Sequence, residues 1–359
     1  MDVVAFSDQH LAPVADLLRR HVSPELDRDP ARFRDFIQAN YLRNPNRTDD
    51  VHPLVAVDEN GAVTGFCGVT AYPMHWRGEP ILLAASGPLI ADPVHRDKAP
   101  GLFLTRAVLS GAQDVAITDG ANDEATMLWQ RMKAEVVALP STRWLRPLRP
   151  SGLGLSLAAE RFPAVGRLIG RTALLDRAVM RRFQPEPVDT TDRELGPDLL
   201  AELTGSIGAA FSLHPAYDTA TLAWQFDELR SVTVKGDLMA RVVLAPDGRP
   251  IGWFLYHLLA DGMCRVMQIG CRPRDAAAVV AHLVDHAARH DGGALFGRLE
   301  SHYWEAIRSQ PVIMLREAPR MLIHAEDVEL RGDIHAGRAL VTRLEGEAWN
   351  GLHHQPMPG

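Results

Sequence analysis

Residues 84–112, AASGPLIADPVHRDKAPGLFLTRAVLSGA, form the stretch that decides how the chain folds. An apolar run at 88–91 is followed by the short polar loop 94–101, and then by apolar residues at helical spacing over 102–109. The stretch therefore predicts a strand, a tight loop and a helix. Successive backbone N–H groups in such a loop, with the positive end of the helix dipole behind them, make a site for an anion such as a pyrophosphate.

The side chains of this loop also suit an anion. Arg96 and Lys98 bring positive charge to it, and Gly101 lets the backbone come close to a ligand. Pro100 fits the first turn of a helix, where an N–H group has no partner within the helix. The alternative is a plain strand-to-helix loop whose arginine and lysine only face solvent.

Length and composition indicate a globular protein of two domains. The chain has 359 residues, of which 46% are hydrophobic, and its formal net charge of −7 argues against a general nucleic-acid-binding surface. Cys67, Cys264 and Cys271 lack the spacing of a metal site or a disulfide framework, and they read as thiols of a reducing compartment. Because the N-terminus has no signal-peptide pattern and no apolar run reaches about 18–20 residues, we expect a soluble cytoplasmic protein.

The first 150 residues predict a mixed α/β arrangement with a definite order of elements. Apolar and alternating runs predict strands, and apolar residues at helical spacing predict helices. The expected order is β-α-α-β-β-β-α-β-α-β-β. The strands are expected at 3–6, 54–57, 63–69, paired 71–76 and 80–84, 88–91, 115–118, 136–139 and 143–148, and the helices from Ser7 or Asp8 to about 18, and at 30–42, 102–109 and 123–133.

The second half of the chain repeats this outline. Its hairpin over 239–254 parallels the hairpin over 54–66. The loop 271–278, which corresponds to the anion loop, contains no glycine, so its side chains would hold the backbone away from a phosphate. We therefore expect a single anion site, in the first half. The other elements expected in the second half are helices at 198–211, 218–229 and 275–290 and a strand at 264–269.

Residues 151–186, between the two halves, read as a helical connector rich in arginine. A basic amphipathic helix can lie on an anionic membrane surface. The alternative is a connector that packs across both domains with its arginines in solvent. The arginines in question are Arg161, Arg167, Arg171, Arg177, Arg181 and Arg182.

The loop Arg96-Asp97-Lys98-Ala99-Pro100-Gly101 resembles the acyl-CoA pyrophosphate loop of the GNAT N-acetyltransferase superfamily, R/Q-x-x-G-x-G/A. It departs from that pattern at Ala99, where glycine is usual, and Pro100 removes one N–H donor. The order of elements is also that of a GNAT domain. The resemblance implies an α/β fold with mixed sheets: a GNAT domain at 1–150 with the acyl-CoA site, the connector at 151–186, and a degenerate GNAT-like domain at 187–359.

The whole chain also looks like a group of bacterial tandem GNAT proteins associated with exopolysaccharide and cell-surface polymer synthesis. The resembling stretches are the anion loop, Asn122, and residues 41–46, 65–69 and 144–148. The resemblance implies transfer of an acyl group, most simply acetyl, from acyl-CoA to an amine. The acceptor is expected to be a small molecule, such as a sugar or an amino-acid-like compound.

The same resemblance implies roles for particular residues. The backbone of Leu89, Ile90 and Ala91 is expected to contact the pantetheine arm and thioester, and residues 96–101 the pyrophosphate. Asn122 either contacts the pantetheine side or simply caps its helix.

GNAT enzymes use direct attack without an acyl-enzyme, so a base is needed near the acceptor. Asp119 is one candidate, with a turn residue as its alternative. Ser86 and Tyr72 are expected to face the acceptor, and Tyr72 to protonate the leaving thiolate. Asp92, His75 and His95 are lesser candidates.

Other chemistries find little support in the sequence. His282, His286 and His290 recur on one helix face, but no cysteine or carboxylate is obviously paired with them, so we expect no metal. Hydrolase elbow, Walker, Rossmann and Cys-x-x-Cys motifs are absent. Two alternatives remain: a non-catalytic GNAT-fold binding or scaffold protein, and a long-chain acyl or aminoacyl transferase at the membrane surface. A homodimer is a further expectation.

Overall fold

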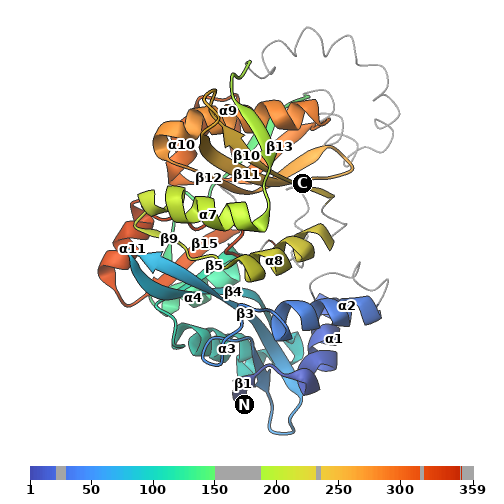
Figure 1. Cartoon of the computed structure of the whole chain (residues 1–359). Helices are drawn as coiled ribbons and strands as arrows, with labels where there is room; N and C mark the ends of the chain where they lie inside the picture. Colours follow the sequence, from blue (N-terminus) through green and yellow to red (C-terminus); the bar gives the residue numbers. More distant parts are fainter. Residues whose placement is uncertain (22–29, 150–186, 232–235, 316–318, 348, 350–359) are drawn as a thin grey trace. The chain divides into compact units, whose positions relative to one another are not determined.

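The computed structural model describes the whole chain except residues 22–29, 150–186, 232–235, 316–318, 348 and 350–359 (Figure 1). The chain divides into two compact units. Unit 1 comprises Met1–Ser141, Phe211–Gln225 and Glu317–His354, and unit 2 comprises Thr142–Ala210, Phe226–Arg316 and Gln355–Gly359. The arginine-rich connector expected at 151–186 lies outside the described residues.

The sheet of unit 1 is mixed. Its β4 and β5 are parallel, and its other neighbours are antiparallel. Across the sheet the strands are β1 (Asp2–Ala5), β2 (Leu54–Val57), β3 (Val63–Trp76), β4 (Glu79–Ala91), β5 (Val115–Ala121), β15 (Arg320–Ala325) and β6 (Glu135–Val136), while β9 (Leu213–Pro215) pairs with β3.

Two long strands replace four expected short ones. Residues 63–76 form the single strand β3 and residues 79–91 the single strand β4, which run side by side in Figure 1. Arg77 and Gly78 between them have φ of 52° and 90°, the conformation of a tight hairpin turn that matches the twist of the strands. Opposite Gly68, the pairing shifts register at Gly87 and Pro88, so β4 carries a bulge there.

Helices cover both faces of this sheet. Side chains that alternate along β2 and β3 divide between the faces, with Val55 and Phe66 on one and Ala56 and Cys67 on the other. The first face packs against α1 (Leu11–His21) and α2 (Pro30–Ile37), and the second against α3 (Pro100–Leu109) and α4 (Asp123–Arg131). The remaining helical segments are η1 (Asp8–His10), the π-helical η3 (Gln38–Leu42), η4 (Pro93–Lys98) and α11 (Val328–His335).

Unit 2 repeats the plan with its own mixed sheet. Its parallel pair is β12 and β13, which corresponds to β4 and β5. The strand order is β14 (Ile313–Leu315), β7 (Arg143–Pro147), β13 (Ala294–Arg298), β12 (Met263–Cys271), β11 (Pro250–Leu258), β10 (Asp237–Leu244) and β8 (Thr191–Glu194). The helical segments are α7 (Pro197–Ile207), η6 (Gly208–Ala210), η8 (Pro273–Asp275), α9 (Ala276–Arg289), η9 (Ser301–Tyr303) and α10 (Trp304–Arg308), while α8 (Thr219–Ser231) contributes residues to both units.

The two halves of the sequence exchange strands, which corrects one expectation. Residues 143–148 were expected to close the first sheet, but β7 pairs with β13 and β14 of unit 2. In its place β15, from near the end of the chain, pairs with β5 and β6 of unit 1. Antiparallel pairing looks the same in either sheet, so the local pattern of a strand does not specify which sheet it joins. The compact units therefore do not follow the boundaries expected at 150 and 187.

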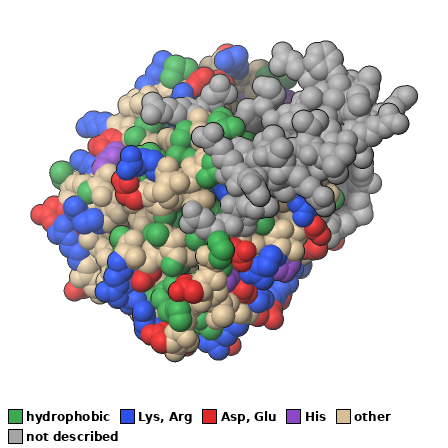
Figure 2. All heavy atoms as spheres, turned by 90° about the horizontal axis from the view of Figure 1, so that it is seen from above, with side chains coloured by type: hydrophobic (Ala, Val, Ile, Leu, Met, Phe, Trp, Pro, Cys, Tyr) green, Lys and Arg blue, Asp and Glu red, His purple; other side chains and the backbone are tan. Residues whose placement is uncertain are grey.

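The surface and the helices add two observations. Acidic and basic side chains are interspersed over the coloured surface in Figure 2, so on this face the net charge of −7 is not gathered into one patch. Among the helices that the structure describes, none is both long enough and apolar enough to cross a bilayer.

Candidate functional site

The central feature of unit 1 is an opening between its two parallel strands. β4 and β5 pair only from Leu83↔Val115 to Ala85↔Ile117, although the strands continue to Ala91 and Ala121. Beyond this point the facing backbone groups must find other partners. The bulge at Gly87 and Pro88 lies at the start of the opening. Residues 89–91, expected to contact the pantetheine arm, form its β4 side.

The loop after β4 is a short 3₁₀ segment that leads into α3. Asp92, a lesser candidate for the base, caps it by accepting the N–H of Val94 at 3.0 Å, so this carboxylate forms the turn. The N–H of Ala99 bonds to the carbonyl of Arg96 at 3.2 Å, and the N–H of Leu102 to the carbonyl of Ala99 at 3.0 Å. The loop's own hydrogen bonds therefore occupy part of the row of amides that the sequence suggests for an anion.

The cations of the loop are on the surface. Arg96 is 82% exposed and lies 3.3 Å from Glu124 of α4, and the Lys98 ammonium lies 3.8 Å from Glu59. Exposed pairs of this kind contribute only about 0–1 kcal/mol each. An incoming polyphosphate can therefore replace both acidic partners at little cost.

Gly101, in the first turn of α3, lacks a structural explanation within the protein. Its backbone has no positive φ, and a Cβ added to it would meet only the Ala91 side chain, at 3.9 Å. Glycine in a helix costs roughly 0.5–1 kcal/mol relative to alanine. The space beside Gly101 therefore permits a ligand to approach the backbone. Pro100 is buried at the helix start, and Asp97 is exposed.

Asn122 caps α4, because its Oδ1 accepts the N–H of Ala125 at 2.9 Å. This is one of the two alternatives that the sequence left open for this residue.

The three catalytic candidates are all buried on neighbouring strands. Tyr72 is on β3, Ser86 on β4 and Asp119 on β5. Ser86 Oγ lies 3.3 Å from the sulfur of Cys67, and burial raises the pKa of that thiol to about 12. Asp119 lies within β5, so the alternative that it is a turn residue is wrong. The glycine after it is part of the strand and does not begin a turn.

A C-terminal segment, Thr342–Glu347 with Trp349, contacts two of these candidates, and sequence reasoning missed it. The N–H of Glu347 bonds to Asp119 Oδ1 at 2.9 Å, and the Trp349 indole donates to the Tyr72 hydroxyl at 2.8 Å. Burial, and then the charge of Glu345, hold the pKa of Tyr72 well above its ordinary value. The segment thus lies over the same part of the sheet as the candidates.

The Glu347 side chain enters the opening itself. A Cβ on Gly87 of β4 would overlap Glu347 Oε2, and a Cβ on Gly120 of β5 would overlap Oε1. The Thr118 hydroxyl donates to Oε1 at 3.3 Å. A glycine inside each of two strands was the signal in the sequence, because glycine weakens a strand unless something approaches closely.

Several bonds fix the C-terminal segment. Glu345 accepts from the N–H and hydroxyl of Thr342 at 2.6 and 2.7 Å, and also from the Tyr217 hydroxyl. Gln225 donates to the carbonyl of Leu344 at 2.9 Å. These bonds hold residues 342–345, which directly precede the turn to Glu347.

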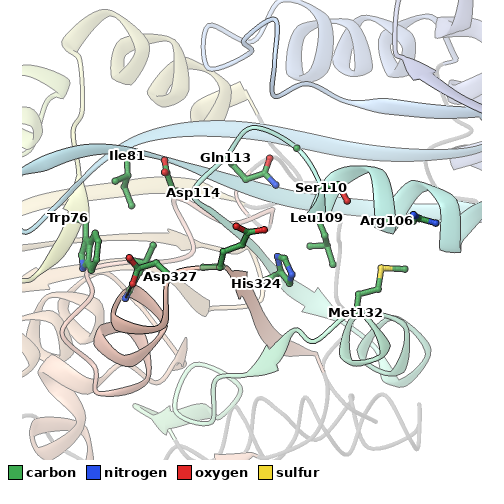
Figure 3. Close-up of a pocket in the computed structure, with 14 residues that line it drawn as sticks. Trp76, Ile81, Arg106, Leu109, Ser110, Gln113, Asp114, Met132, His324 and Asp327 are labelled. Atoms are coloured by element: carbon green, nitrogen blue, oxygen red, sulfur yellow. Dashed lines mark hydrogen bonds between the residues drawn. The ribbon is translucent and has the colours of Figure 1, made fainter.

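A cavity of about 720 Å³ lies at the other end of the same strands (Figure 3). Ile81, near the start of β4, and Asp114, just before β5, line it with His324 and Asp327. Asp114 accepts the N–H of Leu82 at 2.7 Å and Asp327 caps α11, so these carboxylates already hold backbone groups. The cavity is separate from the opening, which faces the ends of β4 and β5.

In unit 2 the corresponding opening is closed by its own side chains. β12 and β13 pair only from Met263↔Ala294 to Arg265↔Phe296. Beyond that point, His302 donates to the carbonyl of Ile269 at 2.8 Å. The Trp144 indole and the Tyr303 hydroxyl donate to the carbonyl of Arg298 at 3.0 and 2.5 Å, and a buried ion pair joins Arg298 to Glu300 at 3.1 Å.

The histidines of α9 are engaged in hydrogen bonds. His282 bonds to Thr190 at 2.7 Å and to Asp192 at 2.9 Å, and His286 bonds to the Tyr256 hydroxyl at 2.9 Å. Within the described residues, no three His, Cys, Asp or Glu side chains are arranged to hold a metal ion.

Solved structures of similar fold are known. A GCN5-related N-acetyltransferase from Anabaena variabilis ATCC 29413 aligns over 91% of this chain and 73% of its own, with a TM-score of 0.59 and 12% identity. One from Kribbella flavida aligns over 90% and 70%, with a TM-score of 0.53 and 13% identity. A protein from Enterococcus faecalis V583, described as a probable N-acyltransferase, aligns over 90% and 72%, with a TM-score of 0.56 and 10% identity.

No family model matches the sequence, and no curated protein matches it. At 10–13% identity the likeness is one of fold. It extends over nine-tenths of the chain and agrees with the parallel pair and the flanking helices of each unit. The chain thus has the mixed α/β fold of the GCN5-related N-acetyltransferases.

Proposed function

We propose that unit 1 is an acyl-CoA-dependent N-acyltransferase. The observation that carries the proposal is the opening between β4 and β5 together with the loop that follows β4. At this loop, Gly101 leaves room that neither packing nor backbone conformation requires. The fold likeness supports the same reaction class.

The reaction would be direct transfer of an acyl group to an amine. In this proposal Leu89, Ile90 and Ala91 hold the thioester arm through backbone groups, and residues 96–101 hold the pyrophosphate. Positioning of the two reactants supplies much of the rate, since it converts a bimolecular step into a unimolecular one. Tyr72 is proposed to protonate the leaving thiolate, and its raised pKa keeps the hydroxyl protonated until the thiolate forms.

The finer assignments extend the proposal. We infer acetyl-CoA as the donor and a small amine as the acceptor, such as a sugar or amino-acid-like compound from cell-surface polymer synthesis in a bacterial cytoplasm. The single cofactor site is assigned to unit 1, because the corresponding loop of unit 2 has no glycine. Three expectations stay predictions: that the protein does not bind nucleic acid, that residues 151–186 contact a membrane surface, and that the chain forms a homodimer.

Calorimetric titration of the full chain with acetyl-CoA tests the proposal. The double variant Arg96→Ala/Lys98→Ala should weaken binding at least about tenfold, because a hydrogen bond to a charged group contributes about 1.5–3 kcal/mol. Arg308→Ala, which removes an exposed arginine of unit 2, is the matched control. If the wild type shows no detectable binding at millimolar acetyl-CoA, the proposal is wrong.

The second candidate is a non-catalytic binding protein of this fold. Ala99 in place of glycine and the loop's internal hydrogen bonds favour it, since both reduce the donors left for a phosphate. Release of free thiol from acetyl-CoA in the presence of amines separates the two. Binding of acetyl-CoA without thiol release would favour the second candidate.

A further inference from the structure

The position of Glu347 in the opening of unit 1 calls for an explanation beyond packing. Glu347 is 7% exposed, and burying a carboxylate is costly unless other groups compensate for the lost hydration. An apolar side chain would fill the same space without that cost. A buried carboxylate beside the proposed reaction site is therefore a candidate for a functional group.

The two strands are built to admit this carboxylate. Gly120 has no positive φ, so its backbone does not require glycine, yet a Cβ there would overlap Glu347 Oε1. Gly87 on the opposite strand has the same relation to Oε2. Both walls of the opening therefore lack side chains where the carboxylate lies.

Glu347 is also held in place. Asp119 accepts its N–H at 2.9 Å, and the Thr118 hydroxyl donates to its Oε1 at 3.3 Å. The Trp349 indole, two residues further on, is bonded to the Tyr72 hydroxyl. The bonds to Asp119 and Thr118 give the Glu347 carboxylate the preorganised position that proton transfer needs.

The bulge of β4 marks the place where the carboxylate would act. Bulges occur next to active sites, where they redirect backbone groups. Gly87, one of the two bulged residues, is the residue that Glu347 Oε2 approaches. The carboxylate thus lies at the point where β4 leaves β5, ahead of residues 89–91 to which the thioester arm is assigned.

We propose that Glu347 is the catalytic residue that takes the proton from the acceptor amine, and that Asp119 is a positioning residue that acts through the Glu347 backbone. This inference rests on the proposed function. The amine nitrogen forms a bond to the thioester carbonyl carbon, and the carbon–sulfur bond breaks with its electron pair going to sulfur. The nitrogen proton passes to the Glu347 carboxylate, and a proton from Tyr72 or Glu347 completes the CoA thiol. If Tyr72 has given its proton, the proton on Glu347 restores it.

The test compares the wild type with Glu347→Gln, which keeps the size of the side chain and removes the base. Both are assayed for thiol release from acetyl-CoA with glucosamine, lysine, spermidine and tyramine between pH 6 and 10, and for CoA binding by calorimetry. Glu305→Gln, on the surface of unit 2, is the matched control.

We expect Glu347→Gln to bind CoA within about threefold of the wild type and to lose about 10²–10⁴-fold in kcat. Its remaining rate should rise with pH over the whole range, as the amine itself deprotonates, whereas the wild-type rate should level off. Glu347→Asp, which keeps a carboxylate on a shorter side chain, should retain the levelling and lose less kcat. It also serves if Glu347→Gln does not fold.

The outcomes separate this inference from the proposed function. If the wild type binds no acetyl-CoA, the proposed function fails. If it binds acetyl-CoA but releases no thiol with any of the amines up to pH 10, the non-catalytic candidate replaces the proposed function, and the inference that rests on it is overturned as well. Retention of kcat within about threefold by Glu347→Gln, with an unchanged pH profile, also overturns it.

Discussion

The two units solve the same geometric problem in opposite ways. In each, a pair of parallel strands separates after three paired positions and leaves backbone groups to be satisfied. Unit 2 closes its opening with His302, Trp144 and Tyr303, which bond directly to the strand carbonyls. Unit 1 borders its opening with glycines, and the carboxylate of Glu347 lies there. The comparison shows that an identical split in a sheet becomes a sealed core or a candidate site according to the side chains around it.

The largest effect should come from filling the glycine wall of unit 1. Gly120→Ala places a methyl group where Glu347 lies, so we expect a loss of about 1–3 kcal/mol in stability, as for other overpacked sites. In the acyl-transfer assay kcat should fall together with it, because the carboxylate is displaced. Thermal unfolding and thiol release measure the two effects.

Gly205→Ala is the matched control, because a Cβ at Gly205 in α7 meets nothing within 4 Å and should stabilise the helix by roughly 0.5–1 kcal/mol. In a Glu347→Gly background, the stability cost of Gly120→Ala should largely disappear. An equal cost in both backgrounds would show that the two residues do not compete for this space.

The loop of unit 1 offers the next largest effect. In Gly101→Val the new side chain projects into open space, so we expect a folded protein whose unfolding midpoint changes little. Affinity for acetyl-CoA should nevertheless fall at least about tenfold, because the side chain keeps the pyrophosphate from the backbone and a charged hydrogen bond contributes about 1.5–3 kcal/mol. Calorimetry measures the affinity, with Gly205→Val as control. Wild-type affinity in Gly101→Val would mean that the ligand binds elsewhere.

The stability of the protein should depend on pH through two buried histidines of unit 2, His302 in the sealed opening and His286 on α9. Burial lowers the pKa of His302 to about 4, and burial with the charge of His290 lowers that of His286 to about 4. Histidine in the unfolded chain has a pKa of about 6.5. Between about pH 4 and this pKa the unfolded state therefore binds more protons than the folded state. Stability should therefore fall as the pH drops from about 6.5 towards 4, by up to about 1.4 kcal/mol per pH unit for each histidine.

The full-chain unfolding midpoint against pH measures this dependence. His302→Gln should reduce the slope, while His21→Gln, on the exposed end of α1, should leave it unchanged. An unaltered slope in His302→Gln would show that this imidazole does not remain neutral in the folded protein.

The smallest effect concerns the surface cation of the loop. Glu124→Gln removes the exposed partner of Arg96, so stability should change by less than about 0.5 kcal/mol. Acetyl-CoA affinity should rise slightly at low salt, because Arg96 no longer has to leave the Glu124 carboxylate before it pairs with the ligand phosphate. This gain should vanish at high salt. A decrease in affinity at low salt would contradict the role given to Arg96.

The sequence predicted the features that depend on neighbouring residues. The first hairpin, the loop after β4 and the helix behind it all follow from turn residues and apolar spacing within a short window, whereas the cap at Asn122 was one of two alternatives. Asp119 was harder, because the following Gly120 suggests a turn when its strand neighbours are unknown.

Features that depend on distant residues were missed or misplaced. The pattern at 143–148 predicts a strand, and β7 is one, but its partner β13 lies about 150 residues further on. The same holds for β15 and for Glu347, whose contacts with Gly87 and Gly120 join the end of the chain to its first half. No periodicity within a segment specifies a partner at that separation, so this part of the candidate site needed the structure.

The central claim is that the opening of unit 1 holds the acyl-CoA and the sealed opening of unit 2 does not. Calorimetric titration of the full chain with acetyl-CoA tests it most directly. The account predicts one acetyl-CoA per chain, with binding weakened at least about tenfold by Gly101→Val and unchanged in Arg274→Ala, which alters the corresponding loop of unit 2. A stoichiometry of zero or two, or binding reduced by the unit 2 variant alone, would contradict it.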